Sequence, residues 1–468
     1  MEKLRLGVNI PMFLAGCITL GAGTLAGMIA IWGSMVFGQP APYWAKIGHA
    51  HASWWGALMI IASLLLPNLE VKPWFKKFAI AVSIAVPWPW VYGLVYGGHG
   101  LGIDVAKYLQ GLFDVLLLIA LGGIALVASG IRVPVIYSGA ASPGRFDYLS
   151  NIEVERRTFL VPTLVALVGV SVGYAIALLF HLLTHEPIKP AALVQLHNHP
   201  VLIAASAVIA LLVLKFMNVT DSIYRKALRI TEVSLVLTTA GLFAFVFGNL
   251  PSVVWVAPAG LYFIVPILAF LAVLGVLPRK GESLFPTGAF RASLAVVYTM
   301  ILVLVALGAV IALLWSTTPD VTVTYKQPEG VQYPGPYPAV YMGTPPARGT
   351  PRGLENAHLS PGSWSHVAAA WLLALAILTP LIVEKWKKPG LLYLFLVTIP
   401  LAPLFNTIGR FLAWATLPPM APGGAGALFY AGHPIKGMNV IALSLMALII
   451  VILIWQNRLQ LKELKPPL

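Results

Sequence analysis

The sequence predicts an all-α, polytopic membrane protein of about twelve transmembrane helices. The chain has 468 residues, of which 59% are hydrophobic and only 10% are charged, whereas soluble domains carry about 25% charged residues. Apolar runs long enough to cross a bilayer recur along the whole chain. Basic residues collect in alternate connecting segments, as the positive-inside rule expects for a multi-pass protein.

Each expected span is an apolar run that can cover a hydrocarbon core of about 30 Å at about 1.5 Å per residue. The first run, from Leu6 to about Phe37, is too long for the core of a cleavable signal peptide and is interpreted as a span. The short stretch from Gly248 to Pro251 predicts a tight hairpin between the seventh and eighth spans. The expected spans are 8–35, 49–68, 76–96, 108–130, 158–182, 197–217, 230–249, 252–277, 291–316, 363–383, 389–410 and 434–456.

The charge distribution predicts the orientation. With the N-terminus inside, 22 of the 30 lysines and arginines fall in inner segments, and the even number of spans makes both termini cytoplasmic. The net charge of +14 therefore reflects membrane topology, and nucleic acid is not an expected partner. We expect membrane lipid around the protein, in the cell membrane of a prokaryote.

Histidines mark a repeat along the chain. His49 and His51 open the second span, His197 and His199 open the sixth, and His366 opens the tenth. The intervals between the second histidines are 199 − 51 = 148 and 366 − 199 = 167 residues, and the long outer loop 317–362 absorbs the difference. We therefore expect a single transmembrane domain of three four-helix arcs, at about 1–135, 155–280 and 290–460.

The spacing within each histidine pair favours ligation of separate groups. Residues i and i+2 of a helix point about 200° apart, because each residue turns about 100°. Such a pair suits a helix that lies between two cofactors, and imidazole is a good ligand for haem iron inside a helix bundle. Alternatively, each histidine is an interfacial or hydrogen-bonded residue. The candidate haem-iron ligands are His49, His51, His197, His199 and His366, and His433 is a further candidate cofactor-binding residue.

Other polar residues of the expected spans receive separate interpretations. Asp114, in the fourth span, is a candidate for a proton path or for a partner of a buried polar group. Glu232 is expected to reach Arg229 and the membrane interface. The single cysteine, Cys17, excludes disulfides, thiolate metal clusters and paired-cysteine haem attachment. Loop or interface positions are expected for His99, His181, His185 and His358.

The layout of three arcs with histidines at spans two, six and ten resembles the catalytic subunit of the haem-copper oxidase superfamily. The stretch from His49 to Pro67 looks like the HxH helix of its nitric oxide reductase and cbb3-type branches, where one histidine ligates a low-spin haem and the other a high-spin haem. The stretch from His197 onward resembles the family's sixth helix, which supplies a histidine to a non-haem metal. The resemblance covers nearly the whole chain in topology and only these segments in sequence.

The chain also departs from that family. The family carries its HxH on helix ten, whereas this chain carries it on helices two and six. The seventh span, Ile230 to Asn249, contains no histidine where the family has its copper-ligating pair, and neither the tyrosine nor the glutamate of the family's branches follows His199. Copper is therefore not an expected cofactor. The resemblance implies haem, b-type or related and two in number, with bis-histidine ligation between arcs: one of His49 or His51 with one of His197 or His199, and the other with His366.

The resemblance favours a haem-binding respiratory cytochrome that passes electrons between quinol or cytochrome and a partner within an electron-transport complex. Partner subunits or an external cytochrome would dock on its outer face. A second hypothesis is a divergent terminal oxidase or nitric oxide reductase catalytic subunit, which would make the chain a respiratory oxidoreductase. A third is a twelve-helix metal or proton transporter, although many transporters consist of two six-helix halves and not of three arcs.

Overall fold

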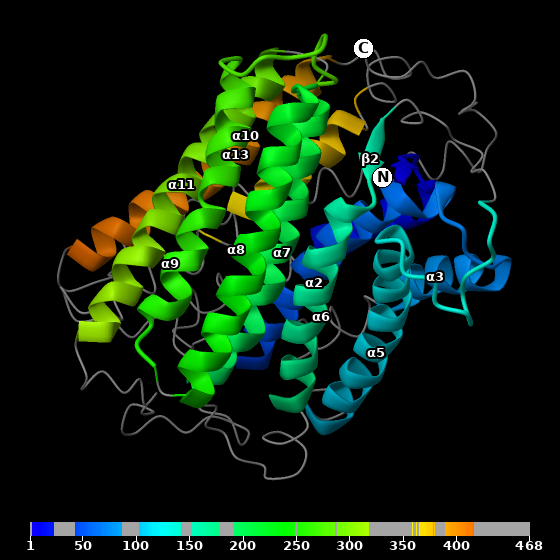
Figure 1. Cartoon of the computed structure of the whole chain (residues 1–468), viewed down its shortest axis with the longest axis horizontal. Helices are drawn as coiled ribbons and strands as arrows, with labels where there is room; N and C mark the ends of the chain where they lie inside the picture. The colour runs from blue at the N-terminus through cyan, green and yellow to red at the C-terminus, as the bar shows by residue number, and fades with distance from the viewer. Residues whose placement is uncertain are drawn as a thin grey trace.

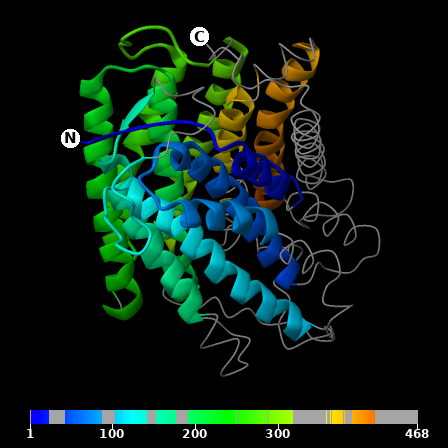
Figure 2. The same cartoon turned by 90° about the vertical axis from the view of Figure 1, so that its right-hand side faces the viewer.

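The computed structural model is mostly helical. It describes residues 2–22, 43–86, 103–141, 152–176, 191–248, 250–285, 288–317, 365–377 and 389–415, together with 358, 362 and 379. Figure 1 shows helices α6 to α11 and α13 running side by side, and Figure 2 shows α2, α3 and α5 inclined to that group. The elements are β1 (Lys3–Arg5), α2 (Tyr43–Leu65), η1 (Leu66–Asn68), α3 (Pro73–Ala85), α5 (Ile103–Ala128), β2 (Glu153–Glu155), α6 (Arg157–Ile176), α7 (Ala191–Phe216), α8 (Asp221–Gly248), α9 (Val253–Tyr262), α10 (Ile264–Leu274), α11 (Gly288–Thr317) and α13 (Pro389–Ala415).

Within the described residues, five helical segments are long and apolar enough to cross a membrane, namely Arg157–Ile176, Gln195–Phe216, Asp221–Gly248, Val253–Leu274 and Gly288–Val310. Four shorter apolar helices accompany them, Ile10–Ala22, Asp114–Ala128, Ser365–Ile377 and Leu392–Leu401. All of these coincide with spans expected from the sequence, so the helical class is confirmed. The last expected span, 434–456, and most of the loop 317–362 lie outside the described residues, and the span count and the side of the termini stay predictions.

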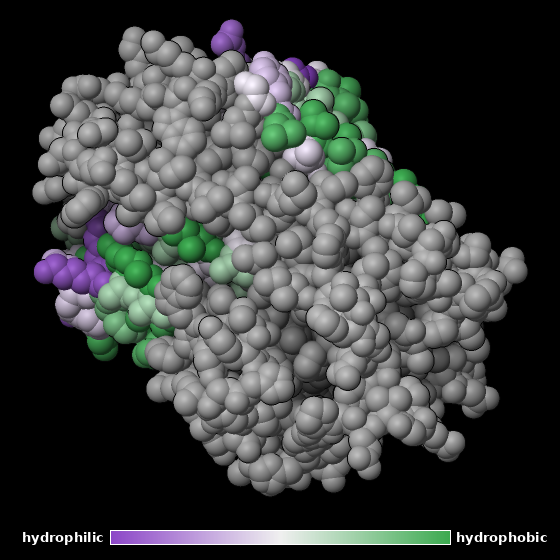
Figure 3. Space-filling model, turned by 180° about the vertical axis from the view of Figure 1, so that it is seen from behind, coloured by the Kyte–Doolittle hydropathy of each residue, from purple (hydrophilic) through white to green (hydrophobic). Residues whose placement is uncertain are grey.

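Helix α8 has its apolar side outward. From Val233 to the C-terminal end of the helix its large exposed side chains are apolar, with Val233 and Val236 each 52% exposed and Phe247 70% exposed. Its buried side carries the small polar residues Thr231, Ser234 and Thr238. A helix on the surface of a soluble protein has the opposite arrangement, so this face suits lipid. Apolar surface also predominates where Figure 3 shows described residues.

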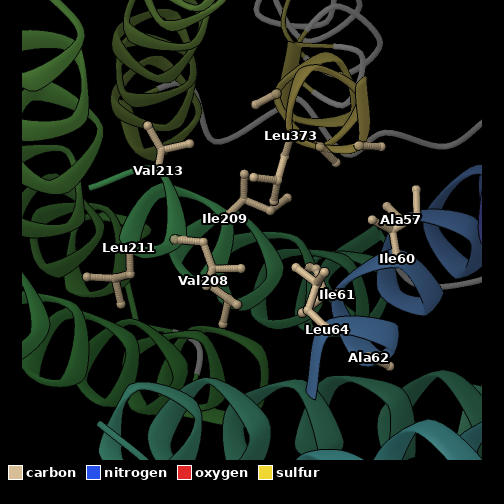
Figure 4. Close-up of a cluster of buried hydrophobic side chains, with 14 of the residues drawn as sticks. Ala57, Ile60, Ile61, Ala62, Leu64, Val208, Ile209, Leu211, Val213 and Leu373 are labelled. Atoms are coloured by element: carbon tan, nitrogen blue, oxygen red, sulfur yellow. The ribbon is translucent and has the colours of Figure 1, made fainter. Parts of the chain in front are cut away.

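Helix α7 lies at the centre of the described core. Of the apolar window Gln195–Phe216, 72% is buried, against 28% for Arg157–Ile176 of α6. Because α7 is apolar all round, it can bury every face. Figure 4 shows Val208 and Ile209 of α7 in one apolar cluster with Ile61 of α2 and Leu373 of the helix Ser365–Ile377. Helix α7 therefore joins segments from all three expected arcs.

Glycine allows close helix contact at two places. A Cβ atom on Gly56 of α2 would lie 2.7 Å from the backbone nitrogen of Leu20 and 2.9 Å from the carbonyl oxygen of Gly16, so α2 and the helix Ile10–Ala22 meet backbone to backbone. A Cβ on Gly241 of α8 would lie 2.4 Å from the carbonyl oxygen of Val254. The second contact closes the hairpin of α8 and α9 that the sequence predicted.

One end of the bundle carries a small sheet that the sequence analysis did not foresee. Strands β1 and β2 pair antiparallel, with Leu4 opposite Val154. Beside them the buried Arg156 donates to the Val127 carbonyl at 2.8 Å and pairs with Glu70 at 3.1 Å and Glu2 at 3.4 Å. The guanidinium thus links the N-terminal segment, the turn after η1 and the end of α5, three segments far apart in sequence.

The expected partner of Glu232 is wrong. Its carboxylate accepts two hydrogen bonds from Arg157 at the start of α6, Nε to Oε1 at 2.5 Å and Nη2 to Oε2 at 2.6 Å. Arg229, the neighbour one turn away on the same helix, is exposed. A bidentate arginine–carboxylate pair is stronger than a single flexible contact, so tertiary packing of α6 on α8 replaced the local interaction.

Candidate functional site

The clearest histidine pair joins α2 and α7. The imidazole rings of His51 and His197 have their centroids 6.2 Å apart and their planes 18° from parallel. The two residues are far apart in the sequence and meet because α2 packs against the central helix α7. The structure therefore brings together one member of each HxH pair.

The neighbouring helix α6 fixes the ring of His197. Its Nδ1 lies 2.9 Å from the carbonyl oxygen of Gly169. A carbonyl can only accept, so Nδ1 carries the proton and the lone pair is on Nε2. A Cβ on Gly173 would lie 2.4 Å from Nδ1 and 2.5 Å from Cε1 of the same ring. Two glycines one helical turn apart thus provide both the acceptor and the space for the imidazole.

A carboxylate of α5 contacts α2 at a residue one helical turn from His51. Trp55, four residues after His51 and on the same face of α2, donates its indole N–H to Asp114 Oδ1 at 2.9 Å. Asp114 belongs to α5 and also lies near Tyr174 of α6, whose hydroxyl is buried and has no hydrogen-bond partner in the described structure. Asp114 is therefore the partner of a buried polar group, one of the two roles expected for it, and the proton-path role stays a prediction.

The two histidines of α7 face different neighbours, as their spacing predicted. The His199 ring packs edge-on against Trp255 of α9, with centroids 5.0 Å apart and planes at 62°. Its Nδ1 lies 3.3 Å from the carbonyl oxygen of Gln195. The ring of His197 instead faces α2 and α6. The imidazoles of His197 and His199 therefore lie on different sides of α7.

His358, which was expected at a loop or interface position, belongs to the expected loop 317–362 and contacts α11. Its ring packs against Gly308 of α11, and its Nδ1 lies 2.6 Å from the Leu304 carbonyl oxygen. It is close enough to interact electrostatically with both His199 and His366. A glycine in the middle of an expected span was the available signal, because it leaves room for a side chain from another segment.

A cavity of about 10 Å³ lies beside His366, roughly the space of one water molecule. It is enclosed by α7, α9, α10, α11 and the helix Ser365–Ile377, and its polar lining comprises Ser206, Tyr262, Tyr298 and His366. Tyr262 and Ser206 line the same cavity, and the buried hydroxyl of Tyr298 has no partner among the described residues. His366 itself has Nδ1 2.7 Å from the Gly362 carbonyl oxygen.

Four of the described histidines share one hydrogen-bond arrangement. In His197, His199, His358 and His366, Nδ1 faces a backbone carbonyl oxygen. Metal-ligating histidines commonly donate their second nitrogen in this way, which fixes both tautomer and ring orientation. The side chain of His49 and the whole of His433 lie outside the described residues. Among the residues that are described, no group of three or more His, Cys, Asp or Glu side chains could hold a metal ion.

Fold and site together define a helical protein with several membrane-length apolar helices. Its described histidines include four whose rings are held by backbone carbonyl groups. In comparisons with known proteins, no protein-family model matches the chain and no curated protein matches it.

Proposed function

We propose that the chain is an integral membrane cytochrome that holds haem between α2 and α7 and passes electrons within a respiratory complex. In this proposal the chain has twelve spans in three arcs, with both termini on the cytoplasmic side of a prokaryotic cell membrane. Quinol or a cytochrome would supply or accept electrons, and partner subunits would dock on the outer face. The exposed apolar face of α8 and the five membrane-length helices support the membrane setting.

The observation that carries the proposal is the geometry of His51 and His197. Two imidazoles on opposite sides of one metal ion have centroids about 6 Å apart, since each metal–nitrogen bond is about 2 Å and each ring adds about 1 Å. The observed separation is 6.2 Å. The lone pair of His197 is on Nε2, as ligation requires. The centroid separation and the tautomer of His197 support these two residues as the pair that would hold the haem iron.

The surrounding residues have definite tasks in this proposal. Gly169 and Gly173 hold and admit the His197 imidazole. Trp55 and Asp114 form a polar contact one turn from His51, which joins α2 to α5 near the ligand. Bound haem supplies one-electron transfer, and the axial ligands and second-shell hydrogen bonds of the protein tune its potential. A second haem on His366 stays a prediction.

The cavity beside His366 supports the second hypothesis, a divergent terminal oxidase or nitric oxide reductase catalytic subunit. An unpartnered tyrosine hydroxyl and an imidazole both line a space of water size. A reaction on a small diatomic substrate would need such polar groups near the ligand-binding position. No comparable feature of the described residues favours a transporter.

The test is a reduced-minus-oxidised optical spectrum of the purified protein and of three variants. Wild type should show sharp low-spin haem bands, and His51→Ala and His197→Ala should each lose one haem. His199→Ala is the matched control on α7, because its ring faces Trp255, and it should keep that haem. A spectral shift with carbon monoxide would favour the catalytic alternative. Absence of haem from the wild type would refute the proposal, and full haem occupancy in both ligand variants would refute the ligand assignment.

A further inference from the structure

Two arginines converge at the C-terminal end of α10. The helix ends at Gly275, whose φ of +83° lies in the left-handed region that glycine adopts easily. Arg279 donates from Nη2 to the carbonyl oxygen of Ala272, and Arg291 donates from Nε to that of Val273, both at 2.9 Å. The partial negative charge at a helix C-terminus explains why cations lie here.

The same geometry brings two like charges close together. Measured from the position of a Cβ on Gly275, Nη2 of Arg291 lies at 2.7 Å and Nη2 of Arg279 at 3.3 Å. The two nitrogen atoms are therefore at most 2.7 + 3.3 = 6.0 Å apart. Burial, followed by the charge of Arg291, holds the pKa of Arg279 below its ordinary value. Helix capping alone does not require two guanidiniums at this separation.

These arginines differ from three other arginines at this end of the bundle. Arg156, Arg157 and Arg225 each pair with a carboxylate, as the ionic contacts with Glu70, Glu232 and Glu155 show. Neither Arg279 nor Arg291 has a carboxylate partner within the described part of the chain. The Nε of Arg279 is buried there without a hydrogen-bond partner. A guanidinium offers five N–H donors, and each of these two has a single donated bond to a carbonyl.

The backbone that carries Arg279 is ordered by its neighbours. Thr220 N donates to the Pro278 carbonyl at 3.2 Å, and Lys280 N donates to the Asn218 carbonyl at 2.9 Å. Lys280 itself pairs with Asp221. The guanidinium of Arg279 is thus held on a fixed turn, which lowers the conformational entropy lost when a ligand binds.

Apolar side chains flank the pair on the outside. Leu274 is 49% exposed and Val276 is 66% exposed, at the end of an apolar helix of membrane length. Basic groups beside exposed aliphatic side chains at a helix end are typical of the zone where lipid head groups lie.

We propose that Arg279 and Arg291 bind one phosphate group, supplied at the membrane surface by an anionic phospholipid. A phosphate can accept a charge-assisted bond of about 2.8 Å from each guanidinium on opposite sides, which fits nitrogen atoms no more than 6.0 Å apart. The single negative charge of the phosphodiester lowers the repulsion between the two guanidiniums, and its oxygen atoms accept from their remaining N–H groups. The exposed side chains of Leu274 and Val276 contact the acyl chains.

The experiment is native mass spectrometry of the intact protein with added phosphatidylglycerol or phosphatidylcholine. Wild type should retain phosphatidylglycerol at least about tenfold more tightly than phosphatidylcholine, and the double variant Arg279→Gln/Arg291→Gln should lose that preference. The matched control is Lys226→Gln/Arg229→Gln on α8, which removes two exposed positive charges from the same end of the bundle. The control should keep the preference.

Inorganic phosphate distinguishes the source of the anion. Displacement of the lipid by millimolar phosphate would identify the head group as the recognised part, and no displacement would identify the whole lipid. Equal retention of both lipids by wild type, or equal loss in the control, would overturn the proposal. If the glutamine variant does not fold, Arg279→Lys/Arg291→Lys replaces it, and an unchanged preference there would overturn the recognition of the phosphate by the two guanidiniums. Haem content should be the same in all variants, so this test is independent of the proposed cytochrome function.

Discussion

Gly173 provides a test of the His51–His197 site that leaves both histidines in place. A Cβ at this position would lie 2.4 Å from Nδ1 of His197, whereas ordinary contact begins at 3.4 Å. Real Cβ atoms essentially never approach closer than 3.0 Å, so Gly173→Ala must move the ring by at least 3.0 − 2.4 = 0.6 Å or push α6 away from α7 by as much. Metal–ligand distances tolerate a deviation of about 0.2 Å, so we expect the His197 bond to haem iron to be lost.

The assay is haem per polypeptide, measured as the pyridine complex, together with the reduced-minus-oxidised spectrum. Gly173→Ala should lower the haem content as His197→Ala does, although no ligand has been removed. Gly122→Ala is the matched control, because its Cβ would meet Leu167 Cδ2 at 3.6 Å, an ordinary contact. Full haem content and an unchanged spectrum in Gly173→Ala would refute the inference that His197 in its observed position ligates haem iron.

Two further predictions concern the ionic contacts at the sheet end of the bundle. Arg157→Ala should lower the free energy of unfolding by about 1–2 kcal/mol, since it leaves the largely buried carboxylate of Glu232 unpaired and the arginine itself is partly exposed. Arg229→Ala should have little effect, and a thermal unfolding series that ranks the two variants the other way would contradict the observed pair. The Lys3–Glu153 pair is exposed, and Lys3 lowers the pKa of Glu153 from 4.5 while Glu153 raises that of Lys3 from 10.5. Its small contribution to stability is therefore present between these values, and is lost as pH falls through the lowered pKa of Glu153 or rises through the raised pKa of Lys3. Thermal midpoints of wild type and Glu153→Gln should differ slightly at neutral pH and converge as pH falls through the lowered pKa of Glu153, and a difference that grows in acid would contradict this assignment.

The helix positions could be predicted because the bilayer imposes a simple rule on composition. A spanning segment must satisfy its own backbone hydrogen bonds and present apolar side chains over about 20 residues. That rule located α11 within a few residues at both ends, whereas α7 and α8 begin 197 − 191 = 6 and 230 − 221 = 9 residues before the expected spans. Helical geometry within one segment also predicted that the rings of His197 and His199 face different neighbours, because residues i and i+2 point about 200° apart.

The pairing of particular side chains could not be predicted in the same way. The choice of Arg157 over Arg229 for Glu232 depends on how α6 packs on α8, and the contact of Trp55 with Asp114 depends on how α2 packs on α5. The position of His358 against Gly308 required a segment from the long loop to reach α11. None of these contacts leaves a periodic signal in a single sequence, since each joins residues separated by dozens of positions.

By itself, the sequence determined that this protein is helical and apolar and that histidine pairs lie in two of its apolar segments, because hydrophobicity and helical periodicity are local properties. The tertiary structure alone decided which histidines meet, which carbonyl fixes each ring and which arginines have no carboxylate partner among the described residues. The physical reason is that ligand geometry needs atoms placed within tenths of an ångström, and only the packing of α2, α6 and α7 against one another sets the 6.2 Å between His51 and His197.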